Sequence, residues 1–261
     1  TMGGHTIREA VKRAGIEPEE VDDVIMGCAV QQGTSGFNIG RTAGIVAGLP
    51  ITVSGMSIDR QCSSGMMAIA TAAKQIIHDG MPIVVGAGLE SISLVQNEHQ
   101  NQYRATDPNV LKIAGAAYMP MIDTAEVVAK RYNISREVQD EYALQSQQRT
   151  AAGQENGKFD DEIVPMPSTK VIFNQENENT VQEDVLLEKD EGNRPSTTLE
   201  GLQGLKPVRE GGVITAGNAS QLSDGASACV LMDSKLAEQK GLNPLGAYRG
   251  MAAAGCEPDE M

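Results

Sequence analysis

Short, unbroken apolar segments alternate with amphipathic segments through the first 90 residues, and this alternation constrains the fold more than any other feature. The apolar segments are too short for helices, while the others carry apolar residues at the spacing of one helix face. The predicted strands are 21–30, 53–59 and 81–88, and the predicted helices are 6–14, 39–47 and 64–78. Strands that are apolar on both faces are typical of a mainly parallel sheet with helices on both sides. The sequence therefore predicts an α/β fold.

The chain becomes polar and rich in loops between about 92 and 222. Two helices are predicted there, at 123–132 and 135–156, and Ser135 is the expected N-cap of the second. The stretch 165–212 is expected to be irregular because it is rich in Pro, Gly, Asn, Asp and Glu. We interpret 92–222 as an insertion that lies over the sheet.

An apolar segment at 226–232 predicts a return of the chain to the sheet. A short helix is expected after it at 234–240, and a further strand at 245–253. The chain starts with Thr1 rather than Met, and 255–261 has the composition of a loop. We therefore expect this chain to be part of a longer polypeptide.

The negative charge excludes partners that need a basic surface. The chain has 21 Lys and Arg against 35 Asp and Glu, a net charge of −14. Nucleic acids and anionic membrane surfaces require clustered positive charge. Aromatic residues make up only 3% of the chain, so base stacking is also not expected. No apolar run approaches the roughly 20 residues of a membrane-spanning helix. We expect neither a nucleic-acid partner nor a membrane span.

The four cysteines indicate free thiols rather than a disulfide framework or a metal site. Cys28, Cys62, Cys229 and Cys256 form no Cys-x-x-Cys pair and have no spacing suited to zinc. Free thiols indicate a reducing compartment, so a cytoplasmic location is expected. Cys28 and Cys229 lie in apolar strand patterns, which predicts that both are buried. No role is assigned to Cys256.

Cys62 differs from the other cysteines because it lies between a predicted strand and a predicted helix. A thiol at the positive end of a helix dipole is favoured in its thiolate form. The small residues at 63–65 are expected to leave backbone N–H groups open to hold an oxyanion, as in the nucleophile elbow of hydrolases. Cys62 is therefore the candidate nucleophile, and the alternative is a small buried side chain.

A second segment, 211–220, is rich in glycine and other small residues. Such a segment allows a bulky ligand to approach the backbone closely. A plain turn has the same composition, and the segment alone does not distinguish the two.

Together these segments resemble the thiolase family, which comprises the acetyl-CoA acetyltransferases and 3-ketoacyl-CoA thiolases. The resemblance is an ordered series that covers essentially the whole chain. The matching segments are 24–27, 62–68, 88–91 (with Leu89 where the family has Met), 124–126, 135–147, 161–165, 215–220 and 224–226.

The resemblance implies a fold, a reaction and a set of contacts. Thiolases are layered αβαβα sandwiches of two similar halves, with a CoA-binding loop domain inserted in the first. They transfer an acyl group between CoA and the α-carbon of another acyl-CoA, through a thioester on a Cys that matches Cys62. Arg194 would contact the nucleotide end of CoA, Ser220 and Ala216 its pantetheine arm, and Met121 would line the same groove. The family binds CoA and acyl-CoA as substrates, with no tightly bound cofactor or metal, and forms homodimers or tetramers.

Three motifs of the family are not found in these 261 residues. They are an Asn-Glu-Ala-Phe segment, a Gly-His-Pro segment with the His that activates the nucleophile, and a Cys-x-Gly segment with the Cys that moves the α-proton. The expected organisation is a first α/β half at 1–91 with 223–240, a CoA-binding loop domain at 92–222, and the start of the second half at 241–261. We expect this chain to be a thiolase cut at both ends and inactive by itself.

Two alternatives remain. The chain would otherwise be a non-catalytic acyl-CoA-binding remnant of a thiolase, which a continuation of the reading frame into a Gly-His-Pro segment would exclude. A related β-ketoacyl synthase is the other reading, and the insertion at 92–222 with its 215–220 segment argues against it.

Overall fold

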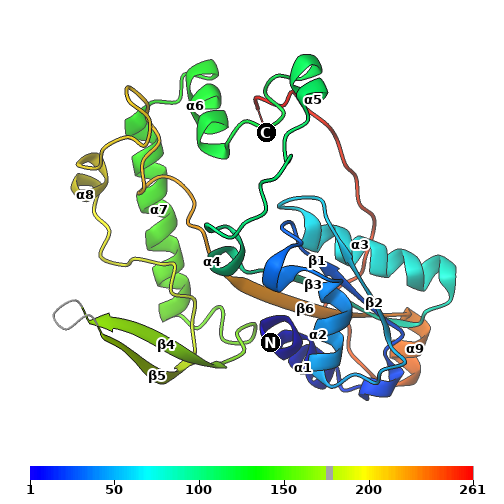
Figure 1. The fold of residues 1–261 in the computed structure, drawn as a ribbon. Helices are drawn as coiled ribbons and strands as arrows, with labels where there is room; N and C mark the ends of the chain where they lie inside the picture. The colour runs from blue at the N-terminus through cyan, green and yellow to red at the C-terminus, as the bar shows by residue number, and fades with distance from the viewer. Residues whose placement is uncertain (175–178, 261) are drawn as a thin grey trace. The chain divides into compact units, whose positions relative to one another are not determined.

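The computed structural model describes residues 1–174 and 179–260, which divide into two compact units (Figure 1). The first unit comprises Thr1–Asn101 and Leu222–Ala252. The second comprises Gln102–Gln221 together with the described residues from Ala253 onward. Each unit therefore contains two separate stretches of the chain.

The first unit is built on a four-stranded sheet of order β2-β1-β3-β6. The strands are β1 (Asp23–Gly27), β2 (Ser54–Ile58), β3 (Ile83–Glu90) and β6 (Gly225–Met232). Strand β1 lies between β2 and β3 and is parallel to both, whereas β6 pairs antiparallel with β3. The predicted α/β fold is confirmed, with an antiparallel strand at one edge of the sheet.

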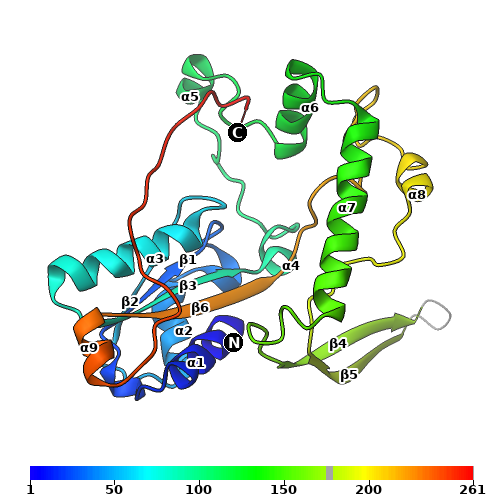
Figure 2. The same ribbon diagram turned by 180° about the vertical axis from the view of Figure 1, so that it is seen from behind.

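Helices cover both faces of this sheet, as the apolar strands predict (Figure 2). One face carries α1 (Met2–Ala14) and α2 (Ile39–Ala47), with α9 (Ser234–Gln239) beside them. The buried side chains of this face include Ile7, Val11, Val24, Met26, Ala43, Ala47, Val85 and Leu89. This cluster is the larger of the two apolar cores.

The opposite face carries α3 (Ser64–Lys74), which continues into a π-helical turn over Gln75–Asp79. Ala68 and Ala72 of α3 pack on Ile25 and Val84 of the sheet. Small side chains at the contact let the helix approach the strands closely, which holds the start of α3 near the carboxyl ends of β1 and β3.

The second unit consists of helices and a β-hairpin. The helices are α5 (Pro108–Ile113), α6 (Met121–Arg131), α7 (Arg136–Glu155) and α8 (Leu199–Gln203), and the short α4 (Ile92–Val95) precedes them in the first unit. The predicted pair at 123–132 and 135–156 corresponds to α6 and α7. Ser135 caps α7, because its hydroxyl accepts a hydrogen bond from Val138 N–H at 3.4 Å. No helix in the described part of the chain has the length and apolarity to cross a bilayer.

Two sequence-based expectations about secondary structure, one in each unit, are wrong. The stretch 165–212 contains an antiparallel hairpin, β4 (Met166–Asn174) and β5 (Asn179–Leu187), where only loops were expected. The expected strand at 245–253 is absent among the described residues, which have no ladder partner there. A strand requires a neighbour to satisfy its backbone groups, and a local apolar pattern does not reveal whether one is available.

Candidate functional site

Cys62 lies in a tight turn between β2 and α3, as the sequence predicts, and its side chain is exposed. Gln61 has a positive φ of 46°, a backbone conformation that non-glycine residues adopt only when their surroundings impose it. Asp59 accepts a hydrogen bond from Gln61 N–H at 2.6 Å. The hydroxyl of Ser64 accepts one from Arg60 N–H at 2.8 Å and donates one to Gln61 O at 2.6 Å. These bonds hold the turn that presents the thiol.

Two of the three backbone N–H groups at 63–65 that were expected to lack a partner donate hydrogen bonds within the turn. Ser63 N–H donates to Arg60 O and Ser64 N–H to Gln61 O, both at 3.0 Å. Among the described residues, the N–H of Gly65 has no such partner. The expectation therefore fails for Ser63 and Ser64, because the turn itself requires their donors, and holds for Gly65.

Small residues form most of the wall around Cys62. The thiol opens onto a shallow cavity of about 360 Å³. Its lining includes Gly27, Ser64, Gly65, Gly88, Glu90, Gly225 and Ser227. A Cβ atom added at Gly27 would lie 2.3 Å from the carbonyl carbon of Ser64, so the end of β1 touches the first turn of α3 directly. The cavity is open because its walls lack side-chain bulk.

Glu90 anchors one wall of the cavity, a role that the sequence did not reveal. Its carboxylate accepts hydrogen bonds from Ala29 N–H at 2.9 Å and Val30 N–H at 3.1 Å. The thiol of Cys28 lies 3.5 Å from the same carboxylate. Burial, followed by the negative charge of Glu90, raises the pKa of Cys28 to about 11. Glu90 was visible in the sequence only as part of the 88–91 motif.

The other cysteines differ from Cys62 in their environments. Cys28 is buried, as predicted, but Cys229 is exposed, and the prediction for Cys229 is therefore wrong. It lies on β6, the edge strand of the described four-stranded sheet, which pairs only with β3 there. Although the residue as a whole is exposed, its thiol donates to Gly86 O of the neighbouring strand at 3.5 Å, and the partial burial of the sulfur there raises the pKa of Cys229. Cys256 is exposed.

The four remaining candidates, Arg194, Ser220, Ala216 and Met121, belong to the second unit. Arg194 is held by its backbone: its N–H donates to Gln147 at 2.8 Å and its carbonyl accepts from Thr197 at 2.7 Å. Its side chain is exposed, and within the described residues its guanidinium makes no hydrogen bond or ion pair. The guanidinium is therefore available to a ligand.

Residues 215–220 form a compact turn around the buried side chain of Thr215. The hydroxyl of Thr215 accepts hydrogen bonds from Gly217 N–H at 3.2 Å and Asn218 N–H at 3.3 Å. Asn218 accepts one from Thr215 N–H at 2.8 Å. The turn leaves Ala216 and Ser220 exposed, so their surfaces are free for contact.

One hydrogen bond joins this turn to the segment before Arg194. Gln221 donates to Gly192 O at 2.6 Å, which places the Ser220 and Arg194 segments side by side. Met121 is the first residue of α6, is 53% exposed and takes no part in this contact. Within 1–174 and 179–260, no three His, Cys, Asp or Glu side chains gather as a metal site would require.

Comparisons with known proteins agree with this arrangement. Residues 1–235 match the family model described as thiolase, N-terminal domain. The chain is 40% identical to the 3-ketoacyl-CoA thiolase of Bacillus subtilis, over 100% of this chain and 66% of that protein. It is 38% identical to the acetyl-CoA acetyltransferase of Cupriavidus necator, with the same coverage of both chains. It is also 40% identical to the peroxisomal 3-ketoacyl-CoA thiolase 1 of Arabidopsis thaliana, over 98% of this chain and 57% of that one.

Solved structures lead to the same group of proteins. The crystal structure of the Bacillus anthracis acetyl-CoA acetyltransferase matches with a TM-score of 0.77 and 40% identity, over 94% of this chain and 62% of that one. The human mitochondrial 3-ketoacyl-CoA thiolase in complex with CoA matches with a TM-score of 0.74 and 32% identity, over 93% and 60%. The chain thus spans about 57–66% of the length of these relatives.

Proposed function

Because the chain belongs to the thiolase family, we propose that Cys62 is the nucleophile of an acyl-CoA acyltransferase. One observation carries this proposal: an exposed thiol stands in a strained turn at the start of a helix and opens onto a cavity walled by glycines. Such a wall lets a thioester carbon reach the sulfur without a clash. The two alternatives to an enzyme nucleophile, a buried structural Cys and a metal ligand, do not fit an exposed side chain without metal-binding neighbours among the described residues.

The proposed step transfers the acyl group from CoA to the protein. The thiolate of Cys62 attacks the thioester carbonyl, an S–C bond forms, and the carbonyl oxygen takes the negative charge. The backbone N–H of Gly65, at the start of α3, would stabilise this oxyanion. Collapse of the intermediate breaks the bond between the carbonyl carbon and the CoA sulfur, which leaves as a thiolate. The product is an acyl group held as a thioester on Cys62.

The second unit would hold the CoA moiety. Among the described residues the guanidinium of Arg194 has no partner, and a guanidinium suits phosphate and also stacks on a flat ring. Ala216 and Ser220 are exposed on the neighbouring turn and would face the pantetheine arm, and Met121 would line the same groove. The matching human thiolase was solved in complex with CoA, which supports this choice of ligand. Since the chain carries a charge of −14, local donors must supply the attraction for a polyanion.

These 261 residues supply the nucleophile without the family's histidine base. His5, His78 and His99 do not stand in a Gly-His-Pro context, and none of the four cysteines is in a Cys-x-Gly context. A positioned general base contributes about 100- to 10,000-fold to rate. We therefore expect slow acylation of Cys62 and no condensation. A non-catalytic acyl-CoA-binding role of these 261 residues by themselves is the second candidate, and the absence of a Gly-His-Pro segment within them is the observation that favours it.

We also propose a cellular location and an oligomeric state for the protein. Free thiols at all four cysteines support a reducing compartment such as the cytoplasm, although some of the relatives are named as peroxisomal. A homodimer or tetramer is proposed for the full-length protein, as the family resemblance implies. The exposed side chains of Met66 and Ile69 on α3 fit an apolar surface that the second half of the family fold would cover.

The test is to incubate the chain with acetyl-CoA and measure the mass of the intact protein. We expect a gain of one acetyl group, removable by hydroxylamine, that peptide mapping assigns to Cys62. Cys62→Ser should abolish this adduct, while Cys229→Ser, the matched change at an exposed cysteine on β6, should leave it. Acetylation of Cys229 or Cys256 in place of Cys62 would refute the proposed nucleophile, and CoA binding without any adduct would favour the non-catalytic alternative.

A further inference from the structure

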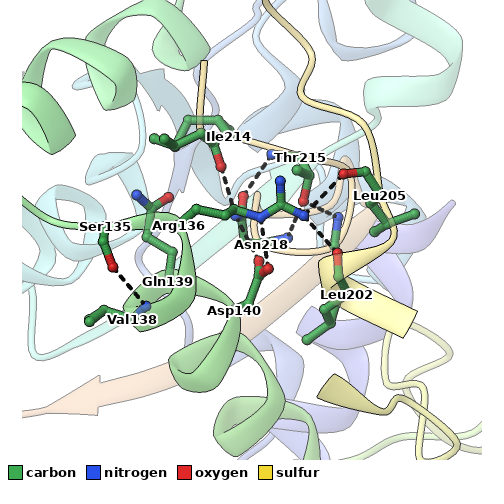
Figure 3. A network of polar contacts seen from close by, with 12 residues as sticks. Ser135, Arg136, Val138, Gln139, Asp140, Leu202, Leu205, Ile214, Thr215 and Asn218 are labelled. Atoms are coloured by element: carbon green, nitrogen blue, oxygen red, sulfur yellow. Dashed lines mark hydrogen bonds and ion pairs between the residues drawn. The ribbon is translucent and has the colours of Figure 1, made fainter. Parts of the chain in front are cut away.

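A buried ion pair lies inside the second unit, next to the 215–220 turn (Figure 3). Asp140 on α7 is completely buried. Arg136, one turn earlier on the same helix, donates from Nε to Oδ2 of Asp140 at 2.7 Å. The same guanidinium donates from Nη2 to Leu202 O at 2.7 Å and Leu205 O at 3.1 Å, at the end of α8. The pair therefore ties α7 to α8.

Asn218 connects this pair to the turn. Its amide nitrogen donates to Oδ1 of Asp140 at 3.1 Å and to Val213 O at 3.0 Å. Its amide oxygen accepts from Thr215 N–H at 2.8 Å. Both donors and the acceptor of the side chain are thus used, and only an amide supplies this combination. An aspartate of the same shape would present an oxygen to Asp140.

The network is expected to restrict the conformation of the turn more than it adds to the free energy of unfolding. A buried ion pair adds little net stability, because the cost of desolvating two charges offsets their attraction. Such a pair instead restricts the conformation of the segments it joins, because a buried carboxylate that loses a hydrogen-bond partner destabilises the fold. Gly217 sits tightly in that conformation: an added Cβ would lie 2.5 Å from Leu202 and 2.6 Å from Leu205. The two residues that the turn leaves exposed are Ala216 and Ser220.

We propose that Asp140, Arg136 and Asn218 are positioning residues that hold the 215–220 turn in the one conformation able to receive the pantetheine arm of CoA. This inference rests on the proposed CoA binding and adds the residues that shape the pantetheine part of the site. Arg194 lies outside the network: its backbone is held by Gln147 and Thr197, and the bond from Gln221 to Gly192 links its segment to the end of the turn and not to Asp140, Arg136 or Asn218. A change in the network should therefore weaken the binding of the pantetheine arm and leave the binding of the nucleotide end of CoA unchanged.

The first test compares two ligands on Asn218→Asp. Calorimetry would measure the affinity for CoA and for adenosine 3′,5′-bisphosphate, which has the nucleotide end without pantetheine. We expect CoA affinity to fall by about tenfold or more, the scale of a lost hydrogen bond to a charged group. The affinity for the bisphosphate should change by less than about twofold. Asn109→Asp on α5, an exposed site, is the matched control for the added charge.

The second test restores the hydrogen bond with the roles reversed. In Asp140→Asn with Asn218→Asp, the new amide at 140 donates to the carboxylate at 218 and its oxygen still accepts from Arg136. We expect the double variant to recover part of the CoA affinity that Asn218→Asp loses, and not all of it, because the carboxylate at 218 cannot donate to Val213 O as the amide did. Unchanged CoA affinity in Asn218→Asp, equal loss of both ligands, or failure of the double variant to recover would overturn the proposal.

A readout without ligand separates this inference from the proposed function. If the unmodified chain binds neither ligand, the proposed CoA binding is refuted. Amide hydrogen exchange then tests, without any ligand, whether the network holds the 215–220 turn. Exchange at Thr215 and Asn218 should be slow in the unmodified chain, faster in Asn218→Asp and slow again in the double variant. Equal exchange in all three proteins would overturn the network's role in holding the turn.

Discussion

At the scale of single residues, the reactivity of each cysteine thiol depends on its burial and on the charges beside it. Cys62 is exposed in a turn, whereas Cys28 is buried beside Glu90 with its pKa raised to about 11. A raised pKa keeps Cys28 as the unreactive thiol through neutral and mildly alkaline pH. We predict that iodoacetamide at pH 8 modifies Cys62 faster than Cys28 by at least about tenfold, and faster than Cys229, whose pKa is also raised.

Mass spectrometry of peptides after brief labelling would measure these rates. Cys256, which is also exposed, serves as the internal reference for a thiol outside a helix start. Faster labelling of Cys28 or Cys229 than of Cys62 would contradict the environments described here. Unfolding the chain in denaturant should bring the rates of all four cysteines close together, because the raised pKa values exist only in the folded state.

At the scale of secondary structure elements, the position of Cys62 depends on the contact between β1 and α3. Gly27 touches the backbone of Ser64 and Gly65, which is not free to move as a flexible side chain would be. We predict that Gly27→Ala destabilises the first unit by roughly 1–3 kcal/mol, the usual cost of overpacking, and slows the acylation of Cys62. Chemical denaturation and the mass assay would measure the two effects.

Gly246→Ala is the matched control for this element. Gly246 belongs to the first unit and an added Cβ would meet no atom within 4 Å. We expect it to leave both stability and acylation within error of the unmodified chain. Equal behaviour of the two variants would show that the approach of α3 to β1 does not matter for the thiol.

At the scale of the whole molecule, the first unit carries apolar side chains that its own elements do not cover. Met66 and Ile69 of α3 are exposed, and Ile77 in the π-helical turn is 61% exposed. We predict that the chain self-associates with rising concentration and that Ile69→Glu with Ile77→Glu shifts the equilibrium toward the monomer. Sedimentation velocity would measure this, with Ile51→Glu, on a separate exposed loop, as the control. A monomer at all concentrations would contradict it.

The sequence by itself determined the features that depend on neighbours along the chain. Apolar residues at helical spacing placed α2 and α3 within a few residues of their observed bounds, and short apolar runs placed β1 and β3. The ordered motifs identified the family, which the match over residues 1–235 confirms. The turn at Cys62 was also visible, because a strand end, a Cys and a helix start stand within ten residues.

Only the tertiary structure decided which distant groups meet. The carboxylate of Glu90 caps the N–H of Ala29, 61 positions earlier, and Asp140 accepts from Asn218, 78 positions later. The same holds for the antiparallel pairing of β6 with β3, which places Cys229 on an edge strand of the described sheet, where it is exposed. Such contacts arise from the packing of whole elements. The periodicity of a segment indicates which of its faces is buried, but not which distant residue that face meets.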